Sequence, residues 1–175
     1  HGGPHVRADS WGPMSTTGVR EAQVLASQGF AVVIPNFRIT PGLGRKIYDQ
    51  GFGTVGTKMS DDHEDAAKWA VEAGFADPKR ICIAGASYGG YATLMGLVKD
   101  PKQYRCGISV VGVSDLLWMY ELGYSDFASY RPETADAHLA VTMGDEKGDR
   151  AMLEKYSPRR HADKIEAPVL MLVAV

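Results

Sequence analysis

A short motif near the middle of the chain, Gly85-Ala86-Ser87-Tyr88-Gly89, separates two segments of different character. The apolar run 81–84 ahead of it is typical of a strand, and the run 90–95 behind it is typical of a helix. A chain that turns this sharply from strand to helix strains its central residue, and glycines two positions to either side prevent clashes. The motif therefore predicts a strand–turn–helix unit that presents the Ser87 hydroxyl as a nucleophile.

The composition fits one globular domain over residues 1–175. The chain is 45% hydrophobic and 23% charged, which provides enough apolar material for a core. Its formal net charge of −2 gives no electrostatic reason to bind nucleic acid or an anionic membrane. No apolar run approaches the roughly 18 residues of a membrane-spanning helix, and the first residues do not resemble a signal peptide. We expect a soluble domain without a nucleic acid or membrane partner.

Helical and strand patterns alternate along the chain, which predicts an α/β fold with a mostly parallel sheet and helices on both faces. We expect helices over 19–28, 60–73, 91–99 and 151–156, and strands over 30–34, 81–85, 107–113 and 168–175. Ser60 is a plausible cap for the second helix. The stretch 36–58 is rich in glycine and proline and is expected to be a loop, and 114–150 is less regular.

Two cysteines, Cys82 and Cys106, each begin an apolar run. A small thiol at such a position is expected to pack in the core as a free, buried side chain. A disulfide would require the two runs to be neighbouring parallel strands in register. Two isolated thiols do not make a zinc pattern, and we expect no metal and no cofactor.

The first residues, His1-Gly2-Gly3-Pro4, form a glycine-rich loop. Glycine lets a backbone N–H approach a developing oxyanion closely, because no side chain obstructs it. The Gly3 N–H, or less favourably the Gly2 N–H, would form an oxyanion hole together with the Tyr88 N–H. Losing one such donor costs about 2.7–4 kcal/mol of transition-state stabilisation. These residues point to acyl-transfer chemistry at Ser87.

Further segments follow one another in an order that a family of peptidases shares. They are Pro35-Asn36-Phe37-Arg38, Gly42-Leu43-Gly44, Gly85-Ala86-Ser87-Tyr88-Gly89-Gly90-Tyr91, Tyr156-Ser157-Pro158 and Ala167-Pro168-Val169-Leu170. With His-Gly-Gly-Pro, they resemble the catalytic domain of the prolyl oligopeptidase family, especially its bacterial acylaminoacyl-peptidase and dipeptidyl-peptidase-like members. The resemblance implies an α/β-hydrolase fold, cleavage of peptide or acyl-peptide bonds through an acyl-enzyme at Ser87, and a cytoplasmic or periplasmic location in a bacterium.

The same resemblance implies that parts of the domain lie outside the chain. In this family the acidic triad residue follows the strand that corresponds to 168–175, and the histidine comes later still. A further strand, ahead of His1, would lie between the strands at 30–34 and 81–85. We therefore expect a catalytic domain that is incomplete at both ends. The 175 residues alone would be inactive, because Ser87 would lack its base.

Residues within the chain offer substitutes for the missing triad members. Asp115 comes just after the strand 107–113, and His138 and His161 follow it. This order fits a triad, but both histidines precede the last strand, so we expect a surface or capping role for Asp115 and a surface position for His161. His5 follows the glycine loop and would either contact substrate or remain solvated.

An apolar and aromatic cluster follows the strand 107–113, and its candidate pocket residues are Val113, Leu117, Trp118 and Tyr120. Side chains at the carboxyl ends of parallel strands often line ligand sites. Here they would favour a hydrophobic residue next to the scissile bond, although core packing remains the alternative for all four.

Other interpretations remain open. Residues 51–56 match G-x-G-x-x-G, but the polar segment 45–50 ahead of them is no strand, so a flexible loop is favoured over a dinucleotide site. Arg38 could pair with a carboxylate near the active site or support the loop that carries it. A carboxylesterase, or a noncatalytic α/β-hydrolase-like module that binds a partner, are the alternative functions.

Overall fold

The structure is a computed structural model that describes residues 1–8, 18–121 and 132–173. Its elements, in chain order, are α1 (Val19–Ser27), α2 (Arg45–Asp49), α3 (Lys58–Glu72), β1 (Cys82–Ala86), α4 (Tyr88–Lys99), β2 (Cys106–Val110), α5 (Trp118–Glu121), α6 (Pro132–Met143), α7 (Arg150–Lys155), the 3₁₀ helix η1 (Pro158–Lys164) and β3 (Val169–Leu172). Within these ranges no helix has the length and apolar character needed to cross a membrane.

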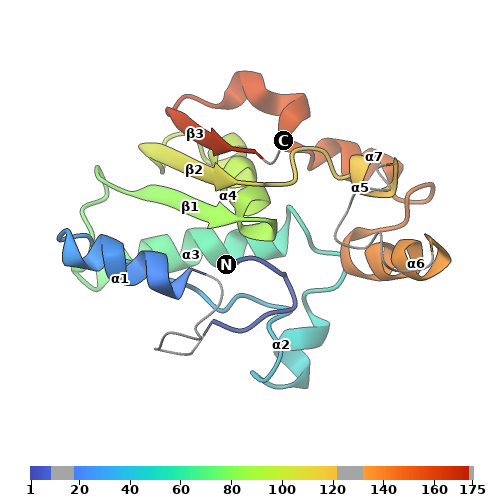
Figure 1. Cartoon of the computed structure of the whole chain (residues 1–175), viewed down its shortest axis with the longest axis horizontal. Coiled ribbons are helices and arrows are strands. Elements are labelled where there is room, and N and C mark those ends of the chain that lie inside the picture. Colours follow the sequence, from blue (N-terminus) through green and yellow to red (C-terminus); the bar gives the residue numbers. More distant parts are fainter. Residues whose placement is uncertain (9–17, 122–131, 174–175) are drawn as a thin grey trace.

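The three strands form a parallel sheet in the order β1-β2-β3. Cys82 lies opposite Cys106 in the first pair, and Gly107 lies opposite Val169 in the second. Figure 1 shows the three arrows pointing the same way, with α4 behind them. The carboxyl ends of β1 and β2 therefore meet at one edge of the sheet, and the segments that follow these strands lie together there.

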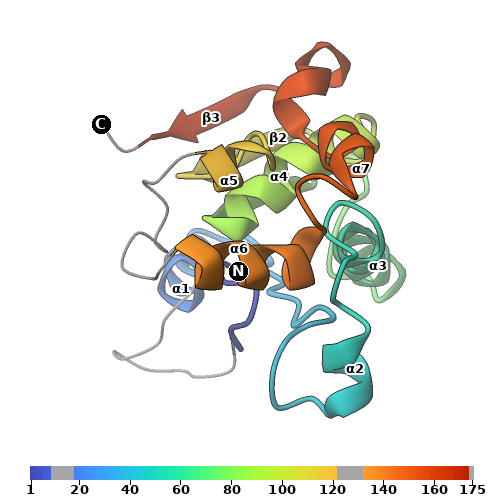
Figure 2. The same cartoon turned by 90° about the vertical axis from the view of Figure 1, so that its right-hand side faces the viewer.

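Helix α4 covers one face of the sheet, and glycines allow it to come close. A Cβ on Gly107 of β2 would lie 2.6 Å from Leu97 Cδ1, and one on Gly96 would lie 3.1 Å from Ile83 Cδ1. On the opposite face Ala84 is exposed, and so are Leu170 and Leu172. Figure 2, turned by 90°, places α1 and α3 on opposite sides of the molecule.

The sequence predicts a strand over 30–34, and this prediction is wrong for the described structure, where the segment pairs with no other strand. A strand exists only where a neighbour accepts and donates its backbone hydrogen bonds. Phe30, Val32 and Val33 are accordingly exposed, at 62%, 38% and 42%. The apolar run supplies strand propensity, but pairing depends on which chain segment lies beside it.

Cys82 and Cys106 form a disulfide with their Cα atoms 4.7 Å apart, so the prediction of two free buried thiols is wrong. The parallel register of β1 and β2 sets the two residues directly opposite one another. Cys82 is exposed and Cys106 half-buried, because their side chains point to the sheet face opposite α4.

Three helices, α2, α5 and α6, lie in segments that show no regular pattern. No residue of α2 is buried, so apolar periodicity could not reveal it. Helix α3 begins at Lys58 with Thr57 in the N-cap position, and Ser60 is a buried residue inside the helix instead of its cap. The core is built around α4, where Tyr91 and Leu97 are fully buried, and it extends to Met59 of α3 and Leu153 of α7.

Candidate active site

Ser87 occupies the single residue between β1 and α4, as the motif predicts. Its φ of 56° and ψ of −118° lie outside the usual range for a residue with a side chain. Such a conformation costs about 1–3 kcal/mol and persists only where the surroundings hold it. Here the Ser87 N–H donates to Val110 O at 2.9 Å, and Ser87 O accepts from the Tyr91 N–H at 3.0 Å. The predicted strained turn is therefore confirmed.

Glycines bring three backbone segments together around this turn. A Cβ on Gly85 would lie 2.5 Å from the backbone carbon of Gly89, and a Cβ on Gly89 would lie 3.1 Å from that of His1. A Cβ on Gly90 would lie 2.6 Å from Gly112 Cα, which closes the turn against the loop after β2. The motif predicts the first two glycines, but no sequence pattern marks Gly112, since only the fold shows what Gly112 contacts.

The loop 1–4 lies against the serine turn. A Cβ on Gly2 would be 3.0 Å from Ala86 O and 3.5 Å from Ser87 Cβ, and Gly3 has a φ of 125° that disfavours any side chain. Tyr88 is the first residue of α4, where a helix leaves its N–H groups without intrahelical acceptors. The structure therefore brings Ser87, the glycine loop and the start of α4 to one place, which is the arrangement an oxyanion hole requires.

A cluster of aromatic and histidine rings packs next to the glycine loop and the start of α4. The His1 ring stacks on Phe37 at 4.5 Å, and Phe37 also contacts His63 at 4.7 Å and Tyr88 at 5.2 Å between ring centroids. Burial lowers the pKa of His63 to about 4 and raises the pKa of the Tyr88 phenol well above its usual value. Both rings are therefore uncharged at neutral pH. No sequence pattern assigns His63 to this cluster, because a single histidine in a helical pattern carries no functional signal.

The four candidate pocket residues follow β2 but differ in exposure. Leu117 is 1% exposed and belongs to the core, and Val113 is half-buried beside it. Tyr120 is half-buried and donates from its hydroxyl to Gly144 O at 2.5 Å. Trp118 is 38% exposed, with the Arg159 guanidinium 4.4 Å above its ring. Trp118 thus offers the largest accessible apolar surface of the four.

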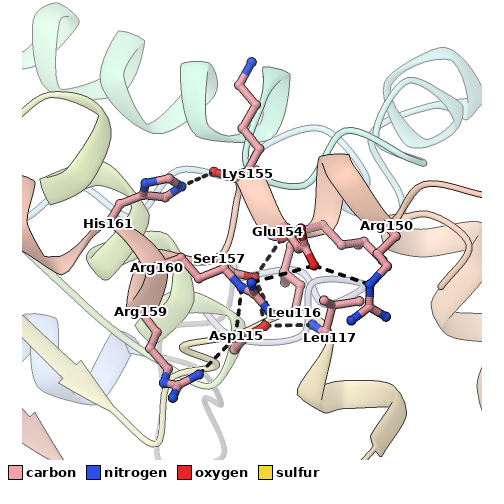
Figure 3. Close-up of polar contacts among 11 residues, drawn as sticks. Asp115, Leu116, Leu117, Arg150, Glu154, Lys155, Ser157, Arg159, Arg160 and His161 are labelled. Carbon is pink, nitrogen blue, oxygen red and sulfur yellow. Dashed lines mark hydrogen bonds and ion pairs between the residues drawn. The ribbon is translucent and has the colours of Figure 1, made fainter. Parts of the chain in front are cut away.

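Asp115 is buried, with a fully inaccessible side chain, so of the two expected roles the surface position is wrong, whereas the capping role agrees with its contact to the Leu117 N–H just before α5. Figure 3 shows its contacts: the Leu117 N–H and the Ser157 hydroxyl donate to Oδ1, each at 3.1 Å. Arg159 Nη1 and Arg160 Nε donate to Oδ2 at 3.5 and 3.3 Å. Among the described residues no histidine contacts this carboxylate. Asp115 therefore links the loop after β2 to η1.

The later histidines have other partners. His161 Nε2 lies 2.9 Å from Lys155 O, and Figure 3 shows the ring directed toward that carbonyl and away from Asp115. The side chain is half-buried and its hydrogen bond is exposed, which agrees with the expected surface position. His138 of α6 faces His5, with ring centroids 5.4 Å apart. The structure therefore gives no support for a triad built from Asp115 and either histidine.

Arg38 and the glycines of 51–56 have structural roles. Arg38 donates two hydrogen bonds to the Asp62 carboxylate, from Nε to Oδ2 at 2.8 Å and from Nη2 to Oδ1 at 2.5 Å. These hydrogen bonds raise the pKa of Arg38. A Cβ on Gly51 would lie 2.2 Å from Ile39 Cβ, and one on Gly56 would lie 2.6 Å from Tyr91 Oη. These glycines lie between α2 and α3 in the sequence and allow close packing against Ile39 and against Tyr91 of α4, so the segment is well packed where a flexible loop was expected.

Comparison with known proteins identifies the family to which this chain is similar. The model of the family described as the prolyl oligopeptidase family matches residues 16–175. Dipeptidyl aminopeptidase BIII of Pseudoxanthomonas mexicana is 38% identical over 173 residues, which cover 98% of this chain and 24% of that protein. The acylamino-acid-releasing enzyme of Arabidopsis thaliana is 30% identical, with 99% and 22% covered.

Solved structures of similar fold are also peptidases. A puromycin-hydrolysing peptidase of Mycobacterium tuberculosis superposes with a TM-score of 0.81 at 31% identity, over 98% of this chain and 24% of the other. An acylaminoacyl peptidase in complex with Z-Gly-Gly-Phe-chloromethyl ketone gives 0.76 at 28% identity, over 98% and 25%. The expected α/β-hydrolase fold is thereby confirmed, and the chain spans about a quarter of the length of these relatives.

Proposed function

This chain belongs to the prolyl oligopeptidase family, and on that premise we propose that residues 1–175 are the part of a serine peptidase domain that carries the nucleophile, Ser87. The observation that supports the proposal is the contact between the strained serine turn and the glycine loop, in which Gly2 lies beside Ala86 O and Ser87 Cβ. A buried structural serine would need neither the strain nor the loop.

The proposed reaction begins with attack of Ser87 Oγ on the carbonyl carbon of a peptide or acyl-peptide bond. The tetrahedral intermediate places its oxyanion between the N–H groups of Gly3 and Tyr88, which stabilise the negative charge. Collapse of the intermediate expels the amine and leaves an acyl-enzyme, which water then hydrolyses. A histidine base and its acid would follow Ser87 in the chain order of this fold, and Asp115 with His138 or His161 does not fit those roles.

Val113 and Trp118 are proposed to line the pocket for the residue next to the scissile bond. Both follow β2 at the sheet edge where Ser87 follows β1, and Trp118 exposes part of its ring there. Leu117 and Tyr120 are proposed to hold these two residues in place. Leu117 packs in the core, and the Tyr120 hydroxyl is hydrogen-bonded to Gly144 O. An apolar wall favours hydrophobic residues at that position.

The test uses the complete gene product and a fluorophosphonate probe. The wild type should be labelled at Ser87 and should hydrolyse acyl-peptide and dipeptidyl arylamide substrates, and Ser87→Ala should lose both. Ser27→Ala, which removes an exposed hydroxyl on α1, is the matched control and should keep both. Failure of Ser87 to react would favour a noncatalytic binding module, and turnover of simple esters without peptides would favour a carboxylesterase.

A further inference from the structure

His5, two residues beyond Gly3, connects the glycine loop to two helices that are distant in sequence. Its Nε2 lies 3.2 Å from Thr142 Oγ1 of α6, and its Nδ1 lies 3.3 Å from the Tyr48 hydroxyl of α2. The ring also contacts Phe52 at 5.7 Å and His138 at 5.4 Å between centroids. The side chain is half-buried, so His5 is neither solvated nor directed only at substrate, the two roles that its position in the sequence suggests.

Both ring nitrogens of His5 have partners. A neutral imidazole offers one donor and one acceptor, and a hydroxyl can complement either, so Tyr48 and Thr142 satisfy the ring in both tautomers. Burial, and then the proximity of His138, lower the pKa of His5, which favours this neutral form. The contacts therefore fix the position of the ring without selecting a tautomer.

The loop 1–8 depends on side chains for its order. Its described residues contain no helix or strand, and Val6 N–H to Pro4 O, at 2.8 Å, is the one backbone–backbone bond among them. At one end the His1 ring stacks on Phe37, and at the other Asn36 binds both the N–H and the carbonyl of Ala8, at 2.9 and 3.0 Å. Between these two anchors, Arg7 Nη1 donates to Gly42 O at 3.2 Å, and His5 makes the side-chain hydrogen bonds nearest in sequence to Gly3.

Helix α6 also supports the candidate pocket. It packs against α5, which carries Trp118 and Tyr120, and the Tyr120 hydroxyl donates to Gly144 O just beyond the end of α6. The Thr142 hydroxyl that holds His5 lies two residues before that glycine. The glycine loop and the pocket segment are thus attached to the same end of α6.

From this geometry we propose that His5 is a positioning residue for the oxyanion hole: through Tyr48 and Thr142 it holds the Gly3 backbone in the orientation that receives the oxyanion. The inference rests on the proposed function and deepens it. His5 acts through Gly3 and does not contact substrate. Its loss should therefore impair the chemical step more than substrate binding, because oxyanion stabilisation is specific to the transition state.

The first experiment measures kcat and KM separately for variants of the complete gene product. Removal of an oxyanion donor lowers kcat by about 10²–10³-fold, and displacing one without removing it should cost less, so His5→Ala should lower kcat about 10–100-fold while KM changes by less than about 3-fold. Tyr48→Phe and Thr142→Val each remove one hydroxyl with little change in volume, and each should lower kcat by about 2–10-fold. Circular dichroism verifies that each variant is folded.

A double variant of His5 and Thr142, and a control variant at another histidine, make this test more specific. Because His5 and Thr142 act as one unit, Thr142→Val should have little further effect on kcat in the His5→Ala background. His161→Ala removes a half-buried histidine that contacts a single carbonyl, that of Lys155, and should leave kcat unchanged. An unchanged kcat in His5→Ala, a loss confined to KM, or full additivity with Thr142→Val would each overturn the proposal.

The second experiment does not depend on activity. Hydrogen–deuterium exchange should show faster exchange of the loop 1–6 amides in His5→Ala, with no change in α4. If the wild type shows no hydrolysis that depends on Ser87, the proposed function fails, and exchange alone then decides the anchoring role of His5. Unchanged exchange in the loop would overturn that role whatever the activity.

Discussion

The rings of His1 and Phe37 stack with their centroids 4.5 Å apart and their planes 22° from parallel. Phe37 is 2% exposed and also contacts Tyr88, the residue after the candidate nucleophile. One buried ring therefore sets the distance between the glycine loop and the serine turn. This explains how a loop without regular structure comes to lie within contact distance of Ala86 O.

His63, which also contacts Phe37, should make stability depend on pH. Its folded pKa of about 4 lies below the unfolded value of about 6.5, so the unfolded state binds more protons between these values. Stability from the neutral ring is fully present above about pH 6.5 and falls as pH drops toward the folded pKa. Burial is the largest cause of the lowered pKa and the positive charge of the His1 amino group is the second, so a chain with residues ahead of His1 should lose less than the roughly 3 kcal/mol that the full shift gives. Urea unfolding of the complete gene product from pH 4 to 7 measures this change, and His63→Phe should flatten it. An equal slope in both proteins would contradict the assignment.

Asp115 should matter for stability and little for chemistry. Asp115→Asn keeps the shape but removes the charge that Arg159 and Arg160 neutralise, and we expect a loss of about 2–3 kcal/mol, below the range for a fully buried pair since both arginines are partly exposed. A triad aspartate changed to asparagine lowers kcat about 10⁴-fold. We expect less than about 10-fold here, and thermal unfolding with steady-state kinetics separates the two outcomes. A loss near 10⁴ would restore Asp115 as a triad candidate.

Gly85→Ala should disrupt the serine turn. The new Cβ would lie 2.5 Å from backbone atoms of Gly89, which cannot move as a side chain can, so we expect a loss of about 1–3 kcal/mol and weaker fluorophosphonate labelling of Ser87. Gly148→Ala is the matched control, because its Cβ would meet only the Asp145 carboxylate at 3.2 Å. Equal behaviour of the two variants would show that the backbone contact is not limiting.

The disulfide between Cys82 and Cys106 should stabilise the sheet. It closes a loop with a sequence separation of 24, for which chain entropy gives about 3.5 kcal/mol. Urea unfolding should show this loss in the Cys82→Ala/Cys106→Ala variant, and a thiol reductant should lower the wild type by a similar amount while leaving the variant unchanged. A reductant effect on the variant would mean that the disulfide is not the source.

Trp118→Ala should reduce selectivity for aromatic substrates. An aromatic pair contributes about 0.5–1.5 kcal/mol, so kcat/KM for a substrate with phenylalanine before the scissile bond should fall about 2–10-fold, while the alanine analogue changes less. Trp69→Ala on α3, whose ring contacts Phe75, is the matched control. Equal losses for both substrates would remove Trp118 from the proposed pocket.

The sequence by itself determined the serine turn and the elements beside it. Strand, serine and helix follow from the glycine spacing, because only a residue without a Cβ fits where β1 and α4 cross. Helix α1 and strands β2 and β3 were also predictable, since the periodicity of their side chains matches their surroundings.

Tertiary structure alone decided which distant residues meet. The Cys82–Cys106 disulfide depends on the register between two strands. The run 30–34 remains unpaired because no described strand lies beside it. Asp115 can be buried because arginines more than 40 positions away in the sequence neutralise its charge. His5 is the clearest case, because its partners on α2 and α6 are 43 and 137 residues distant. Local pattern encodes how a segment is folded, whereas the contacts of a side chain depend on the packing of the whole chain.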